Sequence, residues 1–330
     1  MRVVVCPDKF AGTLTALEAA RAITVGWLRH RPDDEVTQIP LADGGPGFVE
    51  VLHANLGGVV HREQVQDPLG RTVPAQWLEA GGTAYIEAAQ ANGLHLLSPA
   101  ERDPQRTSTY GVGQLIRAAL GQDRIVVGLG GSATNDGGRG AVEALSGRPV
   151  PGLVLATDVD VPLLGPDGAT YGFATQKGAA ASELDALEQR MRDWSRQDPE
   201  LALVPGAGAA GGLGYGLMLL GGRRVSGIDL VVGAVGLARA CADADLVITG
   251  EGKFDWQSLQ GKVVSGVLAA AGDAPVVVLA GRSDLADSPV VVRSLVDEVG
   301  ETRALAEPAA ALAQVAGALA RSWPGEGLSV

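Results

Sequence analysis

The fold is decided first by residues 2–27, RVVVCPDKFAGTLTALEAARAITVGW. The apolar run 3–6 predicts a short buried strand. Thr15 and Glu18 have the spacing of a capping box, which predicts a helix start after a loop. The apolar residues of that helix recur at helical spacing, at Ala16, Ala20, Ile23 and Trp27. The stretch therefore predicts a strand, a loop and an amphipathic helix.

The end of the chain repeats this order. LVITG (246–250) and PVVVLAG (275–281) are typical of buried strands, and KVVSGVLAAAG (262–272) between them is typical of a helix. An alanine-rich helix follows, and EVTQIPLAD (35–43) predicts a further strand near the beginning. Alternating strands and helices indicate a parallel sheet with helices on both faces.

The middle of the chain differs. Residues 59–88 carry the turn signals DPLG and AGG between alternating segments, which predicts antiparallel strands. Strands at 124–130 and 153–160 follow, and then helices at 182–196 and after GAGAAGGLG. We therefore expect an α/β fold in which residues 66–239 form a second α/β domain, inserted into a domain built from residues 1–65 and 240–330.

Composition excludes several classes of function. The 330 residues carry a net charge of -12 and show no basic stripe, which disfavours nucleic acid as a partner. No apolar stretch reaches the ~20 residues of a membrane span, and the first residues do not resemble a signal peptide. Cys6 and Cys241 lack metal or redox spacing, so we expect buried thiols in a cytoplasmic protein. The oligomeric state stays open.

Lysine is scarce in this chain. Among 26 basic residues only four are lysines, and all four lie in glycine-containing loops, at Lys9, Lys177, Lys253 and Lys262. A compact ammonium on a flexible stem suits a moving phosphoryl group better than a guanidinium fork. This favours function over chance for Lys9 and Lys177, and leaves both open for Lys253 and Lys262.

Polar residues follow the predicted parallel strands at the ends where ligands bind in such sheets. Each residue alone is more often a helix cap or a turn residue. Their joint occurrence, with glycines, predicts a site that includes Asp8, Lys9, Asp43, Gly44, Asp158, Asp160, Glu251 and Asp255.

The loop GLGGSATNDGG, residues 128–138, is typical of anion binding. Gly130 and Gly131 allow backbone N–H groups to approach an anion. Ser132, Thr134 and Asn135 add neutral donors, and the following helix adds its positive end. Asp136 is a candidate to bind Mg²⁺ or to accept a proton. The loop matches neither the Walker A nor the dinucleotide-binding pattern.

Eight motifs together resemble the bacterial glycerate kinase family, the class that forms 2-phosphoglycerate. They are, in order, PDKFAGTLTALEAA, LADGGPG, RTSTYGVGQLI, GLGGSATNDGG, DVDVPLLGPDGA, QKGA, GAGAAGGLG and TGEGKFDWQSLQGK. The resemblance implies ATP-dependent phosphorylation of D-glycerate with Mg²⁺. It also implies a flavodoxin-like parallel-sheet domain with a second α/β domain, containing a mixed sheet, inserted into it.

The chain departs from the family pattern at several positions. Lys9 and Ala11 stand where the family usually has Ser and Lys, and Thr157 and Val161 replace Cys and Asn. Pro46 and Phe48 replace the usual Glu and Thr, and the segment between Gly140 and Leu153 is shorter. These changes affect the expected substrate pocket more than the expected reaction.

We assign roles on this basis. Asp158 is the expected base and Lys9 the expected catalytic cation. The expected substrate or phosphate ligands are Asp8, Asp43, Gly44, Arg106, Gly130, Gly131, Ser132, Thr134, Asn135, Lys177 and Lys253. The expected Mg²⁺ ligands are Asp136, Asp160, Glu251 and Asp255. The sequence leaves open whether the glycine loop holds ATP or glycerate. A kinase of another small sugar acid or polyol, or a sensor without turnover, remains an alternative.

Overall fold

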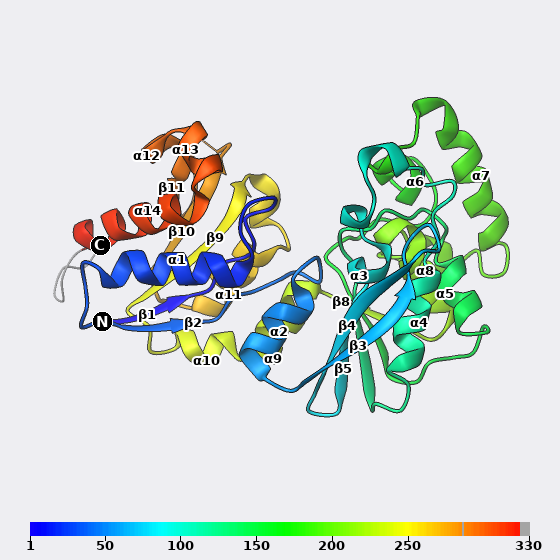
Figure 1. The fold of residues 1–330 in the computed structure, drawn as a ribbon, viewed down its shortest axis with the longest axis horizontal. Coiled ribbons are helices and arrows are strands. Elements are labelled where there is room, and N and C mark those ends of the chain that lie inside the picture. Colours follow the sequence, from blue (N-terminus) through cyan, green and yellow to red (C-terminus); the bar gives the residue numbers. More distant parts are fainter. Residues whose placement is uncertain (286, 324–330) are drawn as a thin grey trace. The chain divides into compact units, whose positions relative to one another are not determined.

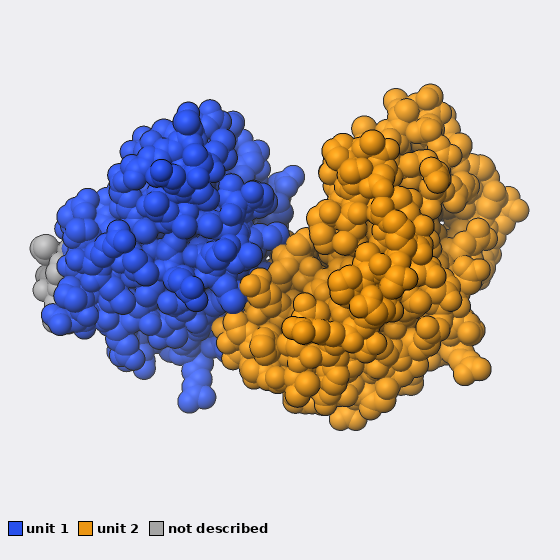
Figure 2. Space-filling model, in the orientation of Figure 1, with its two compact units in different colours: residues 1–42, 228–330 blue, residues 43–227 orange. Residues whose placement is uncertain are grey.

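The chain folds into two compact units, which the computed structural model describes for residues 1–285 and 287–323 (Figure 2). Unit 1 comprises Met1–Ala42 with Ile228–Val330, and unit 2 comprises Asp43–Gly227. Within the predicted segment 240–330, residue 286 and residues 324–330 lie outside the described residues.

Unit 1 contains a five-stranded sheet in which every neighbouring pair is parallel, in the order β11-β10-β9-β1-β2. If these five strands are numbered 1 to 5 in chain order, the sheet read from β2 to β11 has the order 2-1-3-4-5, that of flavodoxin-like folds. The predicted parallel sheet from both chain ends is confirmed. Its strands are β1 (Arg2–Val5), β2 (Glu35–Gln38), β9 (Leu246–Phe254), β10 (Val276–Ser283) and β11 (Val291–Ser294).

Helices cover both faces of this sheet because alternate strand residues point to opposite sides. Val3, Ile248 and Leu279 pack in one core with α1 and α14, which lie side by side in Figure 1. Val278 and Ala280 pack on the other side with α11. The helices of this part are α1 (Ala16–Leu28), α9 (Gly227–Val235), α10 (Leu237–Cys241), α11 (Val263–Ala271), α12 (Leu295–Val299), α13 (Glu301–Ala306) and α14 (Pro308–Ser322).

Helix α1 begins as the sequence predicts. The Glu18 N–H donates to Thr15 Oγ1 over 3.2 Å, and the Thr15 N–H donates to Glu18 Oε2 over 2.8 Å, which completes a capping box. The four apolar residues of the predicted face, Ala16, Ala20, Ile23 and Trp27, are all buried. The local signal and the tertiary packing therefore agree.

Unit 2 contains a six-stranded mixed sheet in the order β3-β4-β5-β6-β7-β8. The pairs β3–β4 and β4–β5 are antiparallel, as the turn signals predict, and the pairs from β5 to β8 are parallel. The strands are β3 (Val59–Gln66), β4 (Thr72–Ala80), β5 (Thr83–Glu87), β6 (Arg124–Gly128), β7 (Leu153–Ala156) and β8 (Arg223–Val225).

The main core of unit 2 joins one face of the sheet to helices α4, α5 and α8. Ile125, Val127 and Leu155 of the sheet pack there with Leu115 and Leu217 of the helices. The helices of unit 2 are α2 (Phe48–Leu56), α3 (Ala89–Asn92), α4 (Tyr110–Ala118), α5 (Arg139–Ala144), α6 (Ala169–Phe173), α7 (Leu184–Ser195) and α8 (Ala209–Leu219). Short 3₁₀ turns include η3 (Thr175–Lys177) in this unit and η6 (Trp256–Leu259) in unit 1.

The boundaries of the two units differ from the predicted segments. Strand β3 pairs with β4 over its whole length, from Val59 opposite Glu79 to Gln66 opposite Thr72, so residues 59–65 belong to the mixed sheet. A turn at DPLG joins the two strands, and a hairpin of this kind keeps both in one sheet. The compact units accordingly divide at 42/43 and 227/228.

Two further observations bear on the expected class of protein. Among the described residues, no helix has both the length and the apolar character needed to cross a membrane. Cys6 and Cys241 are both buried free thiols, as expected.

Candidate active site

A cavity of about 280 Å³ opens at the carboxyl edge of the parallel strands of unit 2. Its wall contains the loop after β6, a residue after β7, the turn η3 and the segment that begins α8. Three of the predicted positions in the glycine loop and Lys177 contribute to it. The lining residues are Leu94, Leu129, Gly130, Gly131, Ser132, Val159, Phe173, Gln176, Lys177, Ala210 and Gly211.

Lys177 is the charged residue of this wall, and it is only 4 % exposed. Its ammonium donates to Ser132 Oγ over 2.9 Å and to the Thr134 carbonyl oxygen over 2.8 Å. Burial lowers the pKa of Lys177 to about 7, although the negative charge of Asp136 opposes the shift. An ammonium has three protons to donate, and these two bonds use two of them.

Asp136 organises the loop from behind. Its carboxylate accepts from the backbone N–H and hydroxyl of Thr109, both at 2.8 Å, and from the N–H groups of Gly138 and Gly140. Burial raises the pKa of Asp136, and these hydrogen bonds act in the opposite direction. Four donors occupy the two oxygens, which favours a role in holding the loop over the predicted role in Mg²⁺ binding.

Thr134 and Asn135 are buried within the loop, away from solvent. Asn92 donates to Thr134 Oγ1 over 3.3 Å, and Asn135 donates to Thr170 Oγ1 over 3.2 Å. Neither residue lines the cavity. Their contacts favour support of the loop, with Thr134 acting on Lys177 through its carbonyl oxygen.

The predicted glycines allow backbone segments to approach closely. A Cβ on Gly131, whose φ is +68°, would lie 2.7 Å from Pro46 Cγ. A Cβ on Gly130 would lie 2.5 Å from Gly45 Cα, and one on Gly44 would lie 2.6 Å from the Ala156 carbonyl oxygen. Gly130 and Gly131 thus both line the cavity and hold the loop against the segment 44–46.

Asp158 follows β7 at the same carboxyl edge of the sheet, but it does not line the cavity. Its Oδ1 accepts from the Ser226 hydroxyl and from the Gly227 N–H, each over 2.8 Å. A Cβ on Gly227 would lie 2.1 Å from the Asp43 carbonyl oxygen and 3.3 Å from Asp158 Oδ2, so both aspartates border this glycine. Asp160, in contrast, is exposed and pairs with Arg224.

Unit 1 gathers a second set of predicted residues at the carboxyl ends of β1 and β9. The Asp8 N–H donates to the Gly250 carbonyl oxygen over 2.8 Å, which brings Asp8 beside the end of β9. Lys9 Nζ lies 3.5 Å from Asp8 Oδ1. Burial raises the pKa of Glu251 to about 7, and the negative charge of Asp8 adds to the shift. Glu251 Oε1 is buried without a hydrogen-bond partner among the described residues.

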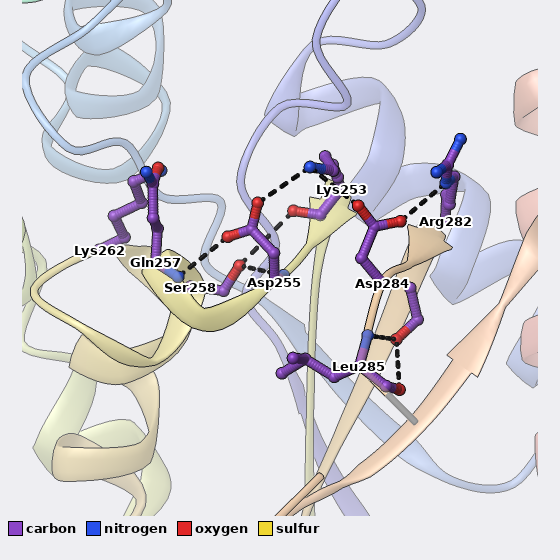
Figure 3. Close-up of polar contacts among 9 residues, drawn as sticks. Lys253, Asp255, Gln257, Ser258, Lys262, Arg282, Asp284 and Leu285 are labelled. Carbon is purple, nitrogen blue, oxygen red and sulfur yellow. Dashed lines mark hydrogen bonds and ion pairs between the residues drawn. The ribbon is translucent and has the colours of Figure 1, made fainter. Parts of the chain in front are cut away.

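Lys253 and Asp255 lie in a surface network beside this set (Figure 3). Lys253 Nζ lies 3.2 Å from Asp255 Oδ2 and 2.9 Å from Asp284 Oδ2, and Asp284 also accepts from Arg282. Burial raises the pKa of Asp255, but the Lys253 ammonium and the Gln257 N–H lower it further, so that it lies below its usual value. Both predicted residues are engaged with protein partners here.

Arg106 is exposed, and its guanidinium contacts no polar partner among the described residues. Across residues 1–285 and 287–323, no three His, Cys, Asp or Glu side chains are grouped so that they could hold a metal ion. The four predicted Mg²⁺ ligands therefore do not form one group. Mg²⁺ in kinase sites needs only one or two carboxylates with substrate phosphates, so this observation leaves Glu251 and Asp255 as candidates.

The sequence missed part of the wall. Phe173 and Gln176 lie just before Lys177, so proximity in the chain was the available signal. Leu94 of the wall carried no such signal, and neither did Ser226, which lies against Asp158, since each reaches the sheet edge only through tertiary packing. Taken together, the fold and the sites define an α/β protein with a pocket lined by glycines and a buried lysine in unit 2, and with a polar edge on the flavodoxin-like sheet of unit 1.

Comparisons with known proteins agree with this description. The profile described as "Glycerate kinase family" matches residues 3–152 and 149–324. A glycerate kinase of Bacillus subtilis is 42 % identical over 325 residues, 85 % of each chain. A glycerate 2-kinase of Escherichia coli is 37 % identical, over 91 % of this chain and 87 % of that one.

A crystal structure from Salmonella typhimurium LT2 that carries the provisional name glycerate kinase 2 matches with a TM-score of 0.81. It is 34 % identical, and 97 % of each chain is covered. The chain belongs to the glycerate kinase family, as the ordered motifs predicted.

Proposed function

We propose that this protein is a glycerate 2-kinase, which transfers the γ-phosphoryl group of ATP to the 2-hydroxyl of D-glycerate. The products are 2-phospho-D-glycerate and ADP. Membership of the glycerate kinase family supports the reaction class and the use of ATP. The observation that carries the proposal is the buried Lys177 in a pocket of unit 2, because its ammonium suits a small acid.

Asp158 is the proposed base or hydroxyl-orienting carboxylate. It follows a parallel strand at the carboxyl end, and the Ser226 hydroxyl and Gly227 N–H orient its Oδ1. A carboxylate held in this way takes the proton of the acceptor hydroxyl as the oxygen attacks phosphorus. Asp43, which borders the same glycine, is the alternative base.

Lys9 and Asp8 are the proposed charged pair at the phosphates. Arg106 and Lys253 are further proposed ligands of the substrate or the phosphates. Phosphoryl transfer is mostly positioning and charge neutralisation, so an ammonium near the transferred group stabilises the transition state. Lys9 is partly exposed, with 26 % of its side chain accessible. It can therefore reach a ligand while it stays near Asp8.

Mg²⁺ is proposed as the accompanying ion. The residues fit it in unit 1, because Glu251 carries a buried oxygen without a hydrogen-bond partner among the described residues, and the negative charges of Asp8 and Asp255 act on this carboxyl. When bound, the ion would neutralise charge on the ATP phosphates. We also propose that the protein is cytoplasmic and acts on small molecules.

A turnover assay tests the proposed function. Purified full-length protein is incubated with MgATP and D-glycerate, ADP release is followed by a coupled assay, and phosphorus NMR identifies the product. Formation of 2-phospho-D-glycerate supports the proposal, whereas 3-phosphoglycerate or no product contradicts it. The same assay with other sugar acids and polyols tests the first alternative, because a related kinase would phosphorylate one of them in preference to D-glycerate. Binding of D-glycerate or ATP without turnover would identify a sensor.

A further inference from the structure

We infer that the exposed indole of Trp256 stacks on the purine base of the nucleotide, so that the turn η6 of unit 1 holds the nucleoside end of the phosphoryl donor. This inference rests on the proposed function, because it adds a residue for the base to the residues proposed for the phosphates and Mg²⁺. The contact uses the flat face of the base and leaves its edge free.

Trp256 is exposed in a chain that has few aromatic residues. Phenylalanine, tryptophan and tyrosine make up 4 % of the sequence, and most of those that the structure describes are buried or half-buried. Across residues 1–285 and 287–323, the exposed aromatic side chains are Trp256, at 64 %, and Tyr171, at 38 %. The Tyr171 hydroxyl donates to Asp185 over 2.8 Å, whereas the Trp256 indole makes no hydrogen bond or ring contact within this part of the chain. A ligand that covered the indole would bury a large apolar surface.

The turn that carries Trp256 is held in place by its own hydrogen bonds. The Asp255 N–H donates to Ser258 Oγ over 3.0 Å, and the Gln257 N–H donates to Asp255 Oδ1 over 2.9 Å. Leu259, the last residue of the turn, packs on the apolar core shared by β9, β10 and α11. The main chain is therefore fixed beneath an exposed ring, and a surface ordered in advance lowers the entropic cost of binding.

Charged groups beside the same turn match the phosphate end of a nucleotide. Lys262 Nζ donates to Gln257 Oε1 over 3.0 Å (Figure 3), and no described carboxylate lies within ion-pair distance of this ammonium. Burial raises the pKa of Glu251 to about 7, and the Ser258 hydroxyl and the Lys262 ammonium oppose that shift, so both lie near the carboxyl proposed for Mg²⁺. Residues 251–262 thus contribute an aromatic face, a cation and a carboxyl.

The shape of the ligand follows from these groups. A three-carbon hydroxy acid presents no flat ring to an indole, and a purely apolar ligand would leave the Lys262 ammonium without an anion. A purine nucleotide supplies both a ring and phosphates. Stacking of a base on an aromatic side chain is a recurrent way of holding nucleotides, because every base has a flat face.

Binding without turnover tests the inference on the full-length chain. Calorimetry measures the Kd of MgADP, of inorganic triphosphate with Mg²⁺ and of D-glycerate. W256A is expected to weaken MgADP by about 5- to 150-fold, the range for loss of one stacked base. The other two ligands are expected to change by less than about twofold. Equal weakening of MgADP and inorganic triphosphate would overturn the inference, because the indole would then act on the phosphates or on the fold.

Two further variants assign the effect to the ring. W256F keeps an aromatic face and is expected to weaken MgADP by less than about fivefold. Y171A removes the other exposed aromatic side chain, which lies in unit 2, and is expected to leave the Kd of MgADP unchanged. A loss in W256F as large as that in W256A, or the same loss in Y171A, would contradict stacking at Trp256.

Fluorescence reports the contact directly. The emission of etheno-ADP is expected to be quenched when its base lies on the indole of the parent protein. At saturating W256A, this quenching is expected to be lost. Quenching of equal depth in the parent and W256A would overturn the inference.

Failure of this inference differs from failure of the proposed function. If W256A keeps the parent's Kd for MgADP and its KM for ATP, the stacking contact is wrong and the proposed reaction stands. If MgADP binds through Trp256 but D-glycerate is never phosphorylated, the proposed function fails and the nucleoside subsite stands.

Discussion

Lys177 is a titratable group in the wall of the cavity where we propose that the acid binds. Its pKa of about 7 is set by burial, with Asp136 as the opposing negative group. Below pH 7 the group is an ammonium that can pair with a carboxylate, and as pH rises through 7 it becomes a neutral amine. The KM for D-glycerate is therefore expected to rise by about tenfold per unit at pH values above this pKa.

Initial rates between about pH 6 and pH 9, at saturating MgATP, measure this dependence. The KM for MgATP over the same range is the control, since the Lys177 pocket is not its proposed site. A KM for D-glycerate that stays flat across this range contradicts the expected role of the ammonium.

Asp158 is expected to act in the chemical step. Asp158→Asn keeps an oxygen that can accept from the Ser226 hydroxyl and the Gly227 N–H, so the fold should be retained. Loss of a positioned general base lowers kcat by about 10²–10⁴-fold. Steady-state kinetics with a thermal-unfolding control measure the effect, and a near-normal kcat would direct the search to Asp43.

Glu251 is expected to make the stability of the free protein depend on pH. Burial raises its pKa to about 7 from the usual 4.5, so between these values the folded state holds a proton that the unfolded state has released. The free energy of unfolding should therefore fall as pH rises through this window. Glu251→Gln should flatten this dependence and exceed the parent in stability at pH 8.

Urea unfolding at about pH 5 and pH 8 measures the difference, without added Mg²⁺. Glu63→Gln, a change at a carboxylate of strand β3 in unit 2, serves as the matched control. An identical pH dependence in the parent and Glu251→Gln would mean that the carboxyl is hydrated in the folded state.

Among the elements, the start of α8 is the most unusual. Ala210, Gly211 and Gly212 all have positive φ, of 53°, 69° and 83°, before the regular helix continues. Such a conformation costs an alanine about 1–2 kcal/mol. Ala210 and Gly211 line the cavity, so this strained segment shapes the pocket wall.

Two substitutions at this segment should have opposite effects. Gly211→Ala introduces a Cβ 1.8 Å from the Thr134 carbonyl oxygen at a residue with positive φ. We expect it to lower the free energy of unfolding by about 2–4 kcal/mol. Ala210→Gly relieves the positive φ, so its effect should lie between zero and about 1 kcal/mol of stabilisation. Urea midpoints compare the two, and equal destabilisation would contradict the argument.

Elements with strong local signals were predictable from the sequence. The capping box and helical face of α1, the buried strand β1 and the hairpin of β3 and β4 were all expected and are present. Strand β8 was missed, because RRV has no apolar pattern and becomes a strand only through pairing with β7. Strand β11 was missed for a related reason, since it lies at the edge of the unit 1 sheet and depends on β10.

The glycine loop shows a limit of motif reasoning. From the sequence, Gly131 was expected to serve anion binding, because it lets a backbone N–H approach a ligand. The structure gives Gly131 a second role in packing, because a Cβ there would meet the Pro46 ring at a positive φ. The contact partner lies in a distant loop, so the sequence alone could not identify it.

At the scale of the whole molecule, ligands were expected at the carboxyl ends of the parallel strands. This expectation did not show that the candidate residues fall into two groups, one in each unit. Ser132 and Lys177 meet in one pocket, while Asp8, Lys9 and Glu251 gather on the sheet of unit 1. The sequence could name these residues from chemistry and strand order. It could not separate them into groups, since each group joins segments that are far apart in the chain.

The described residues that line the cavity of unit 2 belong to the continuous segment 43–227, which also contains the complete mixed sheet. A fragment of residues 43–227 is therefore expected to unfold cooperatively and to bind D-glycerate within about tenfold of the full chain's Kd. The shorter fragment 66–239 lacks almost all of β3 and the whole of α2, which contacts β4 and β5. Strand β4 would become the edge of the sheet, still paired with β5 but with its other side exposed, so we expect this fragment to aggregate or fail to fold. Circular dichroism, thermal unfolding and calorimetry compare the two fragments, and equal folding of both would contradict the boundary drawn by β3.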